Sequence, residues 1–322
     1  MESRTLFLIV NTRCEIACKY CFYTSGYEAR DQVIIEPEDL GKAIVTLKKL
    51  GFSTIIITGG EPLSRRYFEH SLHIIKALKR NGFTVIVNTS GVNLDFEACS
   101  RLVLSDPDRI DISLDSHEES INNNQRGGYT DVIKTMNNLS ILGYIKTVAT
   151  IVITDENSDS ILETFYYLKA LGIGECRLQP AFIPKNNKSG VSKQVIIGDK
   201  LRRSLELIST LSPTPDVTRK YFKYWERYYG DQTDDIVKIV NETPICNMGK
   251  SSFVALSNWD MIGCFHRKDL TYGNILLDTA ESIEEKIHKC ELFSALHPSC
   301  AGAHCVSLFS RPKNWQTQES IK

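Results

Sequence analysis

Short apolar runs and longer amphipathic stretches alternate along about the first two thirds of the chain. Most of the apolar runs are rich in β-branched residues, and all have the length of strands; they are Thr5–Val10, Thr54–Thr58, Thr84–Asn88, Ile110–Leu114, Thr147–Ile153 and Cys176–Gln179. The stretches between them carry apolar residues at helical spacing; they include Glu38–Leu50, Tyr67–Arg80, Val132–Leu142 and Ser158–Leu171. Strand-then-helix units in series predict an α/β fold with a parallel sheet.

This pattern leaves two architectures open, because six such units can form either an open doubly wound sheet or a partial barrel. Pro213 and Pro215 then interrupt the chain, and the sequence becomes rich in cysteine after Pro244. We therefore expect four segments, which are a barrel or sheet over 1–211, a helical linker over 212–243, a small cysteine-rich domain over 244–310 and a polar tail over 311–322.

The composition is that of an ordinary globular protein. Of the 322 residues, 42% are hydrophobic and 24% are charged, which excludes disorder as the main state. The formal net charge is -1, so no bulk charge favours nucleic acid or an anionic membrane as a partner. The N-terminal apolar run Leu6–Val10 is too short for a signal peptide or a membrane span. We expect a cytoplasmic protein.

Ten cysteines are unevenly distributed, with three in Cys14–Cys21 and five in Cys246–Cys305. Disulfides are rare in a reducing compartment, so clustered cysteines there indicate metal binding or catalysis. The first group follows the first strand directly, at the end where parallel α/β folds hold their active sites. Three thiols without a local fourth ligand suit an iron–sulfur cluster with one open iron. Zinc completed by a distant ligand is the alternative.

The motif Cys14-x3-Cys18-x2-Cys21, with Tyr20 before the last cysteine, resembles the cluster motif of the radical S-adenosylmethionine (SAM) superfamily. Other segments resemble this family's motifs in the same order; they are the turn Gly59, Gly60, Glu61 and Pro62, the polar turn beginning at Asn88, and the ribose-contacting segment with Ser113 and Asp115. Arg126 is a candidate partner for the SAM carboxylate, with a solvated surface arginine as the alternative. The resemblance implies a partial (β/α)6 TIM-like barrel that binds one [4Fe–4S] cluster and SAM.

The chemistry that this resemblance implies is the reductive cleavage of SAM. The glycines of the Gly59–Pro62 turn allow the backbone to approach a ligand, and Glu61 can orient a positively charged amino group. The resulting 5′-deoxyadenosyl radical removes a hydrogen atom from the substrate. A flavodoxin- or ferredoxin-type electron donor is also implied. Because the first strand begins at Thr5, no N-terminal peptide-recognition domain fits, which favours a small-molecule substrate over a short peptide.

The stretch from Cys246 to Cys264, followed by Gly273-Asn274-Ile275, resembles the start of the SPASM/twitch extensions of radical SAM enzymes. Such extensions contain a β-hairpin, and the sequence indicates a strand near Ser252–Leu256 and a helix near Ser282–Ser294. The full SPASM form uses more cysteines than this region supplies. The resemblance therefore implies one auxiliary [4Fe–4S] cluster; its ligands would be Cys246, Cys264, Cys300 and Cys305. A four-thiolate zinc site is the alternative.

A cluster ligated only by thiolates is best suited to accept an electron. The main functional hypothesis is therefore a radical SAM oxidoreductase that dehydrogenates or oxidatively tailors a substrate in a biosynthetic pathway. The alternatives are a peptide maturase that forms cross-links and an epimerase in which Cys290 donates a hydrogen atom. A non-enzymatic zinc-binding module is an alternative of a different class. Cys99 and Cys176 are expected in the core.

Overall fold

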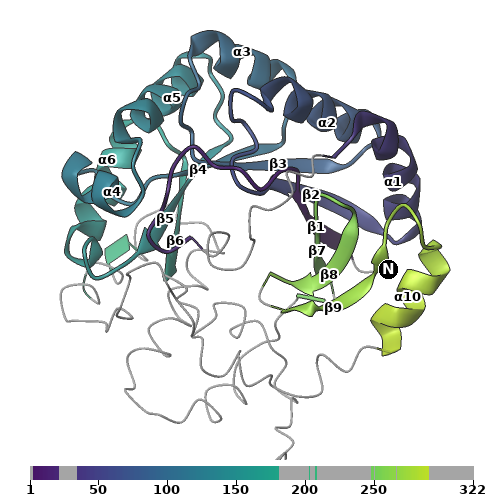
Figure 1. The fold of residues 1–322 in the computed structure, drawn as a ribbon. Coiled ribbons are helices and arrows are strands. Elements are labelled where there is room, and N and C mark those ends of the chain that lie inside the picture. The colour runs from purple at the N-terminus through teal and green to yellow at the C-terminus, as the bar shows by residue number, and fades with distance from the viewer. Residues whose placement is uncertain are drawn as a thin grey trace, which may run out of the picture.

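A single curved sheet organises the part of the chain that the computed structural model describes (Figure 1). The described residues are 3–21, 35–180, 203, 207–208, 248–249, 251–265 and 267–289. Six parallel strands come first in the chain: β1 (Arg4–Ile9), β2 (Phe52–Thr58), β3 (Thr84–Thr89), β4 (Arg109–Ser113), β5 (Thr147–Ile153) and β6 (Glu175–Pro180). Each lies within two residues of its expected position.

Helices cover the outer, convex face of this sheet (Figure 1). They are α1 (Pro37–Lys49), α2 (Phe68–Arg80), α3 (Phe96–Leu104), α4 (Glu119–Gln125), α5 (Tyr129–Ile141) and α6 (Ile161–Ala170). The strands follow one another across the sheet in chain order from β1 to β6. A doubly wound sheet would instead reverse its strand order at a switch point. The expected partial barrel is therefore confirmed, and the doubly wound alternative is wrong.

Local sequence signals explain where several helices begin. Pro37 lies in the first turn of α1, where its missing N–H costs nothing. The Asp95 side chain caps α3 by accepting a hydrogen bond from the Ala98 N–H. Helix α5 begins after Gly128, three residues before the expected start, because Gly128 takes the left-handed conformation there. A 3-10 turn over Ser158–Ser160 precedes α6 and accounts for its later start.

The main core lies between the sheet and its helices. Alternate strand residues, such as Ile110 and Ile112 of β4, are fully buried in it. Cys99 and Cys176 belong to this core, as expected. The residues between them on each strand face the opposite, inner side of the barrel, since side chains alternate along a strand. The barrel wall therefore presents a second row of side chains to its interior.

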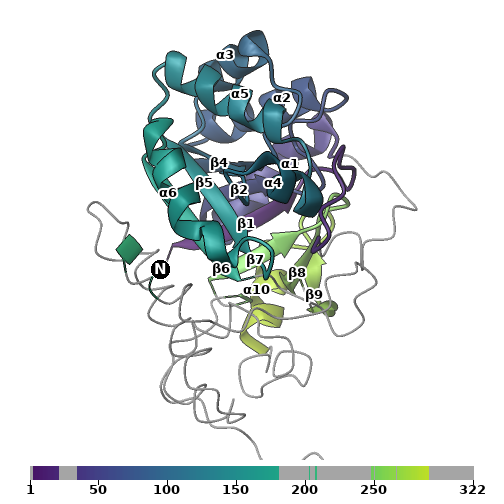
Figure 2. The same ribbon diagram turned by 90° about the vertical axis from the view of Figure 1, so that its left-hand side faces the viewer.

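The C-terminal strands extend the same sheet beyond β1 (Figures 1 and 2). They are β7 (Ser252–Ala255), β8 (Asp260–Cys264) and β9 (Arg267–Asn274). Strand β7 pairs in parallel with β1, and β8 and β9 follow as an antiparallel hairpin. Helix α10 (Ala280–Lys289) confirms the start of the expected helix, whose remainder lies outside the described residues, as do the linker 212–243 and the tail 311–322.

No helix among the described residues combines the length and the apolar character needed to cross a bilayer.

Candidate functional site

The loop after β1 carries the first cysteine group at the C-terminal edge of the sheet. Cys14 is exposed there, whereas Cys18 and Cys21 are partly buried. Burial raises the pKa of Cys18 to about 11, and the nearby Arg126 guanidinium acts against that increase. The Cys18 thiol is therefore protonated at neutral pH, so binding a metal centre would release its proton. Among the described residues, no three side chains are arranged as ligands of one metal ion.

The Gly59–Pro62 turn packs directly against the segment that leads into the cysteine loop. Gly60 N–H donates to the Asn11 carbonyl at 2.9 Å, and Glu61 N–H donates to the Arg13 carbonyl at 2.5 Å. A Cβ at Gly59 would clash with the Asn11 backbone, and one at Gly60 would clash with the Arg13 backbone. The glycines thus allow two loops to approach each other, whereas the sequence interpretation assigns them to ligand approach.

The carboxylate of Glu61 is buried and joins the β2 loop to the end of β3. Its Oε1 accepts hydrogen bonds from Leu63 N–H at 2.9 Å and from the Thr89 hydroxyl at 2.7 Å. Its Oε2 accepts one from Ser90 N–H at 2.6 Å. Burial raises the pKa of Glu61, and these hydrogen bonds oppose the increase. Glu61 therefore fixes the relative positions of two loops at the mouth of the barrel.

Tyr20, Asp115 and Arg126 form one buried network. Arg126 Nε donates to Asp115 Oδ2 at 3.1 Å, and its Nη2 donates to the Tyr20 hydroxyl at 2.7 Å. The Tyr20 hydroxyl in turn donates to Asp115. Burial by itself would lower the pKa of Arg126, but Asp115, Tyr20 and Cys18 together outweigh burial and hold this pKa above its ordinary value. Arg126 is only 8% exposed, so the alternative of a solvated surface arginine is wrong.

Several polar atoms near this network have no partner among the described residues. Arg126 Nη1 makes no hydrogen bond to any of them, although the rest of its guanidinium is engaged. The buried Oδ1 of Asn88 has no partner there, and neither does the amide of Gln125, which is 2% exposed. Buried polar atoms normally hydrogen-bond, so these groups suit a polar ligand. SAM, with its carboxylate, ammonium and hydroxyl groups, fits this set.

The remaining expected residues fall into two groups. Pro62 is buried within its turn, and Ser113 lies half-buried at the end of β4 opposite Thr150. Cys264 lies at the end of β8 and is partly buried. The other expected residues lie outside the described part of the chain; they are Cys246, Cys290, Cys300 and Cys305.

Two residues of this region are missing from the sequence-based prediction. Asn11 donates from its side chain to the Glu61 carbonyl at 3.0 Å and accepts at Oδ1 from Arg13 N–H at 3.1 Å. A polar residue directly after an apolar strand was the available signal. Gln125 is next to Arg126, and the backbone carbonyl of Gln125 accepts a hydrogen bond from Lys19 N–H at 2.9 Å. Its burial has no sequence signal, because glutamine is usually exposed.

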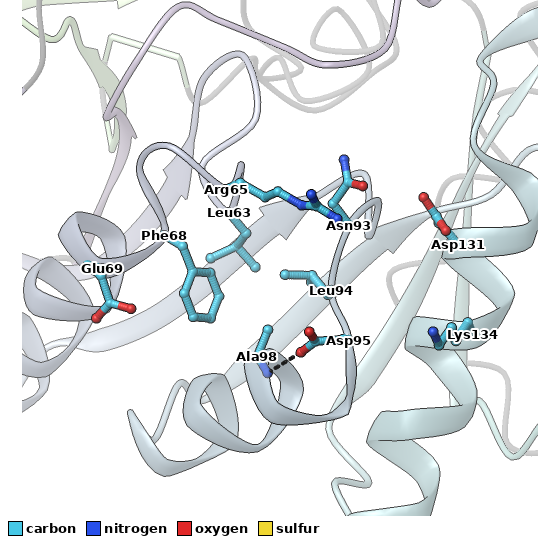
Figure 3. A pocket seen from close by; sticks show the side chains of 10 residues that line it. All are labelled: Leu63, Arg65, Phe68, Glu69, Asn93, Leu94, Asp95, Ala98, Asp131 and Lys134. Atoms are coloured by element: carbon cyan, nitrogen blue, oxygen red, sulfur yellow. Dashed lines mark hydrogen bonds between the residues drawn. The ribbon is translucent and has the colours of Figure 1, made fainter.

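A pocket of about 360 Å³ lies beside the cysteine loop, on the outer side of the barrel mouth (Figure 3). Its residues come from the loops after β2 and β3 and from α2, α3 and α5; they are Leu63, Arg65, Phe68, Glu69, Asn93, Leu94, Asp95, Ala98, Asp131 and Lys134. Glu15 of the cysteine loop accepts hydrogen bonds from Arg65 N–H and the Asn93 amide. None of the expected SAM-binding residues lines this pocket.

A cysteine triplet, a glycine-rich turn and a buried arginine at the mouth of a partial barrel define a cofactor-dependent barrel enzyme. The model of the Radical SAM superfamily matches residues 8–168, half of the chain. The chain belongs to the radical SAM superfamily, and it is an enzyme. The family uses a [4Fe–4S] cluster together with SAM, as expected. The non-enzymatic zinc module is therefore wrong.

Two curated relatives illustrate the sequence similarity. A probable GTP 3′,8-cyclase of Methanococcus aeolicus is 28% identical over 134 residues, which cover 41% of this chain and 44% of the relative. The mycofactocin maturase MftC of Mycolicibacterium smegmatis is 27% identical over 152 residues, which cover 47% of this chain and 38% of the relative. The matches thus span less than half of either relative.

Solved structures share the fold at lower identity. SuiB of Streptococcus suis bound to SAM superposes with a TM-score of 0.68 at 16% identity, covering 95% of this chain and 72% of SuiB. Tagged anSMEcpe with bound AdoMet gives a TM-score of 0.64 at 16% identity, covering 98% of this chain and 92% of that one. Both similarities confirm the architecture.

Proposed function

We propose that the chain is a radical SAM oxidoreductase that removes a hydrogen atom from its substrate and then one further electron. The observation that supports this best is the contact between the cysteine loop and the buried Tyr20–Asp115–Arg126 network. When bound, the cluster and SAM supply the 5′-deoxyadenosyl radical that takes the hydrogen atom. The protein's own residues bind these groups, orient them and exclude water around them.

We assign the residues of the first site the following roles. Cys14, Cys18 and Cys21 would hold the cluster, because they are the thiols of one loop. Arg126 would bind the SAM carboxylate through Nη1, while Asp115 keeps its other nitrogens in place. Arg–carboxylate pairs of this kind are strong and directional.

The SAM ribose and ammonium would be bound at the ends of three neighbouring strands. Asn88 offers the ammonium or a hydroxyl an acceptor, its Oδ1, which no described residue engages. Ser113 would contact the ribose from the end of β4. The carboxylate of Glu61 already accepts three hydrogen bonds. We therefore assign Glu61 to positioning both loops around SAM, with Gly59, Gly60 and Pro62 providing the turn.

An auxiliary [4Fe–4S] cluster would accept the electron that remains after the substrate radical loses a proton. Its proposed ligands are Cys246, Cys264, Cys300 and Cys305. Strand β8 carries Cys264 in the same sheet as β1, with β7 between the two strands, and because β8 runs antiparallel to β7, Cys264 lies at the edge of the sheet opposite to the cysteine loop. This shared sheet supports a substrate position between the two cysteine regions. A flavodoxin- or ferredoxin-type protein remains the predicted source of the first electron.

A peptide substrate is the second candidate, and the similar proteins favour it. SuiB has been crystallised bound to the precursor peptide SuiA, and anSMEcpe with a Cp18Cys peptide. MftC is named a maturase. These relationships support a peptide cross-linking or epimerising role beside the small-molecule hypothesis. The variant Cys290→Ala distinguishes epimerisation from dehydrogenation. An epimerase would lose product and solvent deuterium incorporation, whereas a dehydrogenase would retain its product.

The decisive experiment compares Cys18→Ala with Cys99→Ala after anaerobic reconstitution. The wild type should bind about eight irons per chain and form 5′-deoxyadenosine from SAM under strong reductant. Cys18→Ala should lose about four irons and all SAM cleavage. Cys99 lies in the outer core at 0% exposure, so Cys99→Ala should keep both. Retained SAM cleavage in Cys18→Ala would refute the assignment of the site.

A further inference from the structure

A cluster of charged residues lies on the inner face of the barrel, next to the strand ends assigned to SAM: Asp111 pairs in register with Asn88 and lies two residues before Ser113 on β4. Asp111 and Arg109 of β4 alternate with Ile110 and Ile112, which pack under the helices. The inner orientation of the charged pair follows from this alternation. Arg177 of β6 reaches Asp111 across β5 at 3.3 Å, so it lies on the same inner face. Glu175 completes what we name the β4–β6 cluster.

The two arginines are held in place from behind by one buried carboxylate. Arg109 donates Nε to Asp111 Oδ1 at 2.6 Å and Nη2 to Oδ2 at 3.0 Å. Arg177 donates Nη1 to the same Oδ2. The Asp111 side chain is only 8% exposed. The two bonds to Arg109 fix the plane of its guanidinium group, and the single bond restrains Arg177, which reduces the entropy that a ligand must overcome on binding.

Both arginines keep donors that the described residues leave unused. Arg109 Nη1 and Arg177 Nη2 hydrogen-bond to none of the described residues. The side chains are 24% and 22% exposed, so they reach solvent from within the barrel. Arg177 Nε also donates to Glu175 Oε1 at 3.0 Å. Since Glu175 is 24% exposed, this contact is weak and can be exchanged for another carboxylate.

The opposite part of the inner face is apolar. Ile9, Val254 and Ile262 form a small cluster of their own on β1, β7 and β8, with Phe7 and Phe265 packed against it. Phe7 and Phe265 meet edge to face with ring centroids 5.3 Å apart. The barrel interior therefore has a charged wall on β4–β6 and an apolar wall on β1, β7 and β8. A substrate in this interior would meet both.

We propose that the β4–β6 cluster binds a carboxylate of the substrate, through Arg177 and Arg109, with Glu175 displaced from Arg177. This inference rests on the proposed function, because it places the substrate in the barrel interior. The planar fork of each guanidinium matches the two oxygens of a carboxylate. The two arginines and two acids of the cluster sum to zero charge. A singly charged carboxylate is therefore accommodated at lower electrostatic cost than a doubly charged phosphate.

The test uses two probes of the same shape that differ at the end of the side chain, N-acetyl-glutamic acid α-amide with a carboxylate and N-acetyl-glutamine α-amide with a neutral carboxamide. Their binding to the reconstituted, SAM-saturated enzyme is measured by isothermal titration calorimetry. The wild type should prefer the carboxylate probe by about tenfold. Glutarate is the third probe: tighter binding of capped glutamate identifies a peptide side chain, and tighter binding of glutarate identifies a small acid.

Two variants should shift the preference in opposite directions. Arg177→Gln removes the fork and should bring the preference to within about twofold. Glu175→Gln removes the competing carboxylate but keeps both arginines, so it should tighten binding of the carboxylate probe about threefold. Arg101→Gln is the matched control, because Arg101 pairs with Glu69 on the outer surface; it should behave as the wild type.

Specific results would overturn the inference. Equal or absent binding of the two capped probes to the wild type would refute it, as would tighter binding of inorganic phosphate. A Glu175→Gln enzyme with unchanged affinity would show that Glu175 does not occupy the binding position. Wild-type SAM cleavage without added substrate is measured in parallel. If cleavage occurs but the carboxylate preference is missing, only the inference fails; if cleavage is missing, the proposed function fails.

Discussion

Two buried carboxylates, Glu61 and Asp115, hold the candidate site together by accepting hydrogen bonds from several segments. Glu61 receives donors from the β2 loop and the end of β3. Asp115 receives Arg126, Tyr20 and the Val152 N–H of β5 at 2.9 Å. Hydrogen bonds to a charged, buried acceptor are stronger than average. Removal of a single hydroxyl group from this site should therefore weaken SAM binding measurably.

Tyr20→Phe tests this expectation. The change removes the hydroxyl that accepts from Arg126 and donates to Asp115, so Arg126 loses one of its anchors. We expect SAM to bind about tenfold more weakly, equivalent to about 1.4 kcal/mol. Equilibrium dialysis with the reconstituted enzyme gives the dissociation constant. Tyr166→Phe is the control, since Tyr166 is 52% exposed on α6. An unchanged constant in Tyr20→Phe would show that the hydroxyl does not position Arg126.

The sequence predicted the residues whose chemistry is visible in a short motif. The cysteine triplet and the Gly59–Pro62 turn are local patterns, and the structure brings them together through the Asn11–Arg13 segment. The pairing of Asp111 with Arg177, 66 positions apart, was not predictable from such patterns. It depends on strand register, which fixes which residues of β4 and β6 share a face.

At the scale of elements, periodicity located the strands because most of them are rich in β-branched residues and covered on their outer face. Helix starts were less well placed. Gly128 caps α5 in the left-handed conformation, and a 3-10 turn precedes α6; neither feature has a periodic signal. The choice between barrel and open sheet needed the family resemblance, since each strand has the same pattern in both. The packing of one loop against another likewise has no signal in the sequence.

Gly60→Ala should disrupt that loop packing. A Cβ there would clash with the Arg13 backbone, which cannot move without moving the cysteine loop. We expect the free energy of unfolding to fall by about 3 kcal/mol, and iron uptake on reconstitution to fall with it. Urea denaturation and iron analysis measure both. The control is Gly41→Ala in α1, where nothing lies near the new Cβ; it should stabilise the chain by about 0.5–1 kcal/mol. Wild-type iron uptake in Gly60→Ala would contradict the assigned role of this glycine.

At the scale of the molecule, the two ends of the described chain meet at the start of β1. The parallel pairing of β1 with β7 places the C-terminal strands in the barrel sheet. Phe253 of β7 is fully buried and meets Phe52 and Tyr272 edge to face. Arg4 lies over the Phe253 ring and donates to the Leu50 carbonyl at 2.7 Å. The sequence predicts a small cysteine-rich domain over 244–310 but not this pairing, because pairing between strands so distant in the chain has no local signature.

Arg4 also pairs with Glu284 of α10, and this contact should make the stability of the molecule depend on pH. Nη1 and Nη2 donate to the two carboxylate oxygens at 2.5 and 2.7 Å. These bonds lower the pKa of Glu284, and His288 lies 3.1 Å from the same carboxylate. A lowered folded-state pKa stabilises the fold above the unfolded-state pKa of about 4.3, and the stabilisation is lost as the pH falls through the folded-state value.

Glu284→Gln should therefore lower the free energy of unfolding by about 1 kcal/mol at pH 7, a modest value because the carboxylate is 31% exposed. The difference from the wild type should persist down to about pH 5 and shrink below about pH 4. Urea denaturation at each pH measures it. Glu285→Gln is the matched control, since Glu285 pairs with Lys289 at the surface of the same helix, and it should cause no measurable change. A Glu284→Gln difference that stays constant as the pH falls would instead assign the effect to packing of α10, with no contribution from the ion pair.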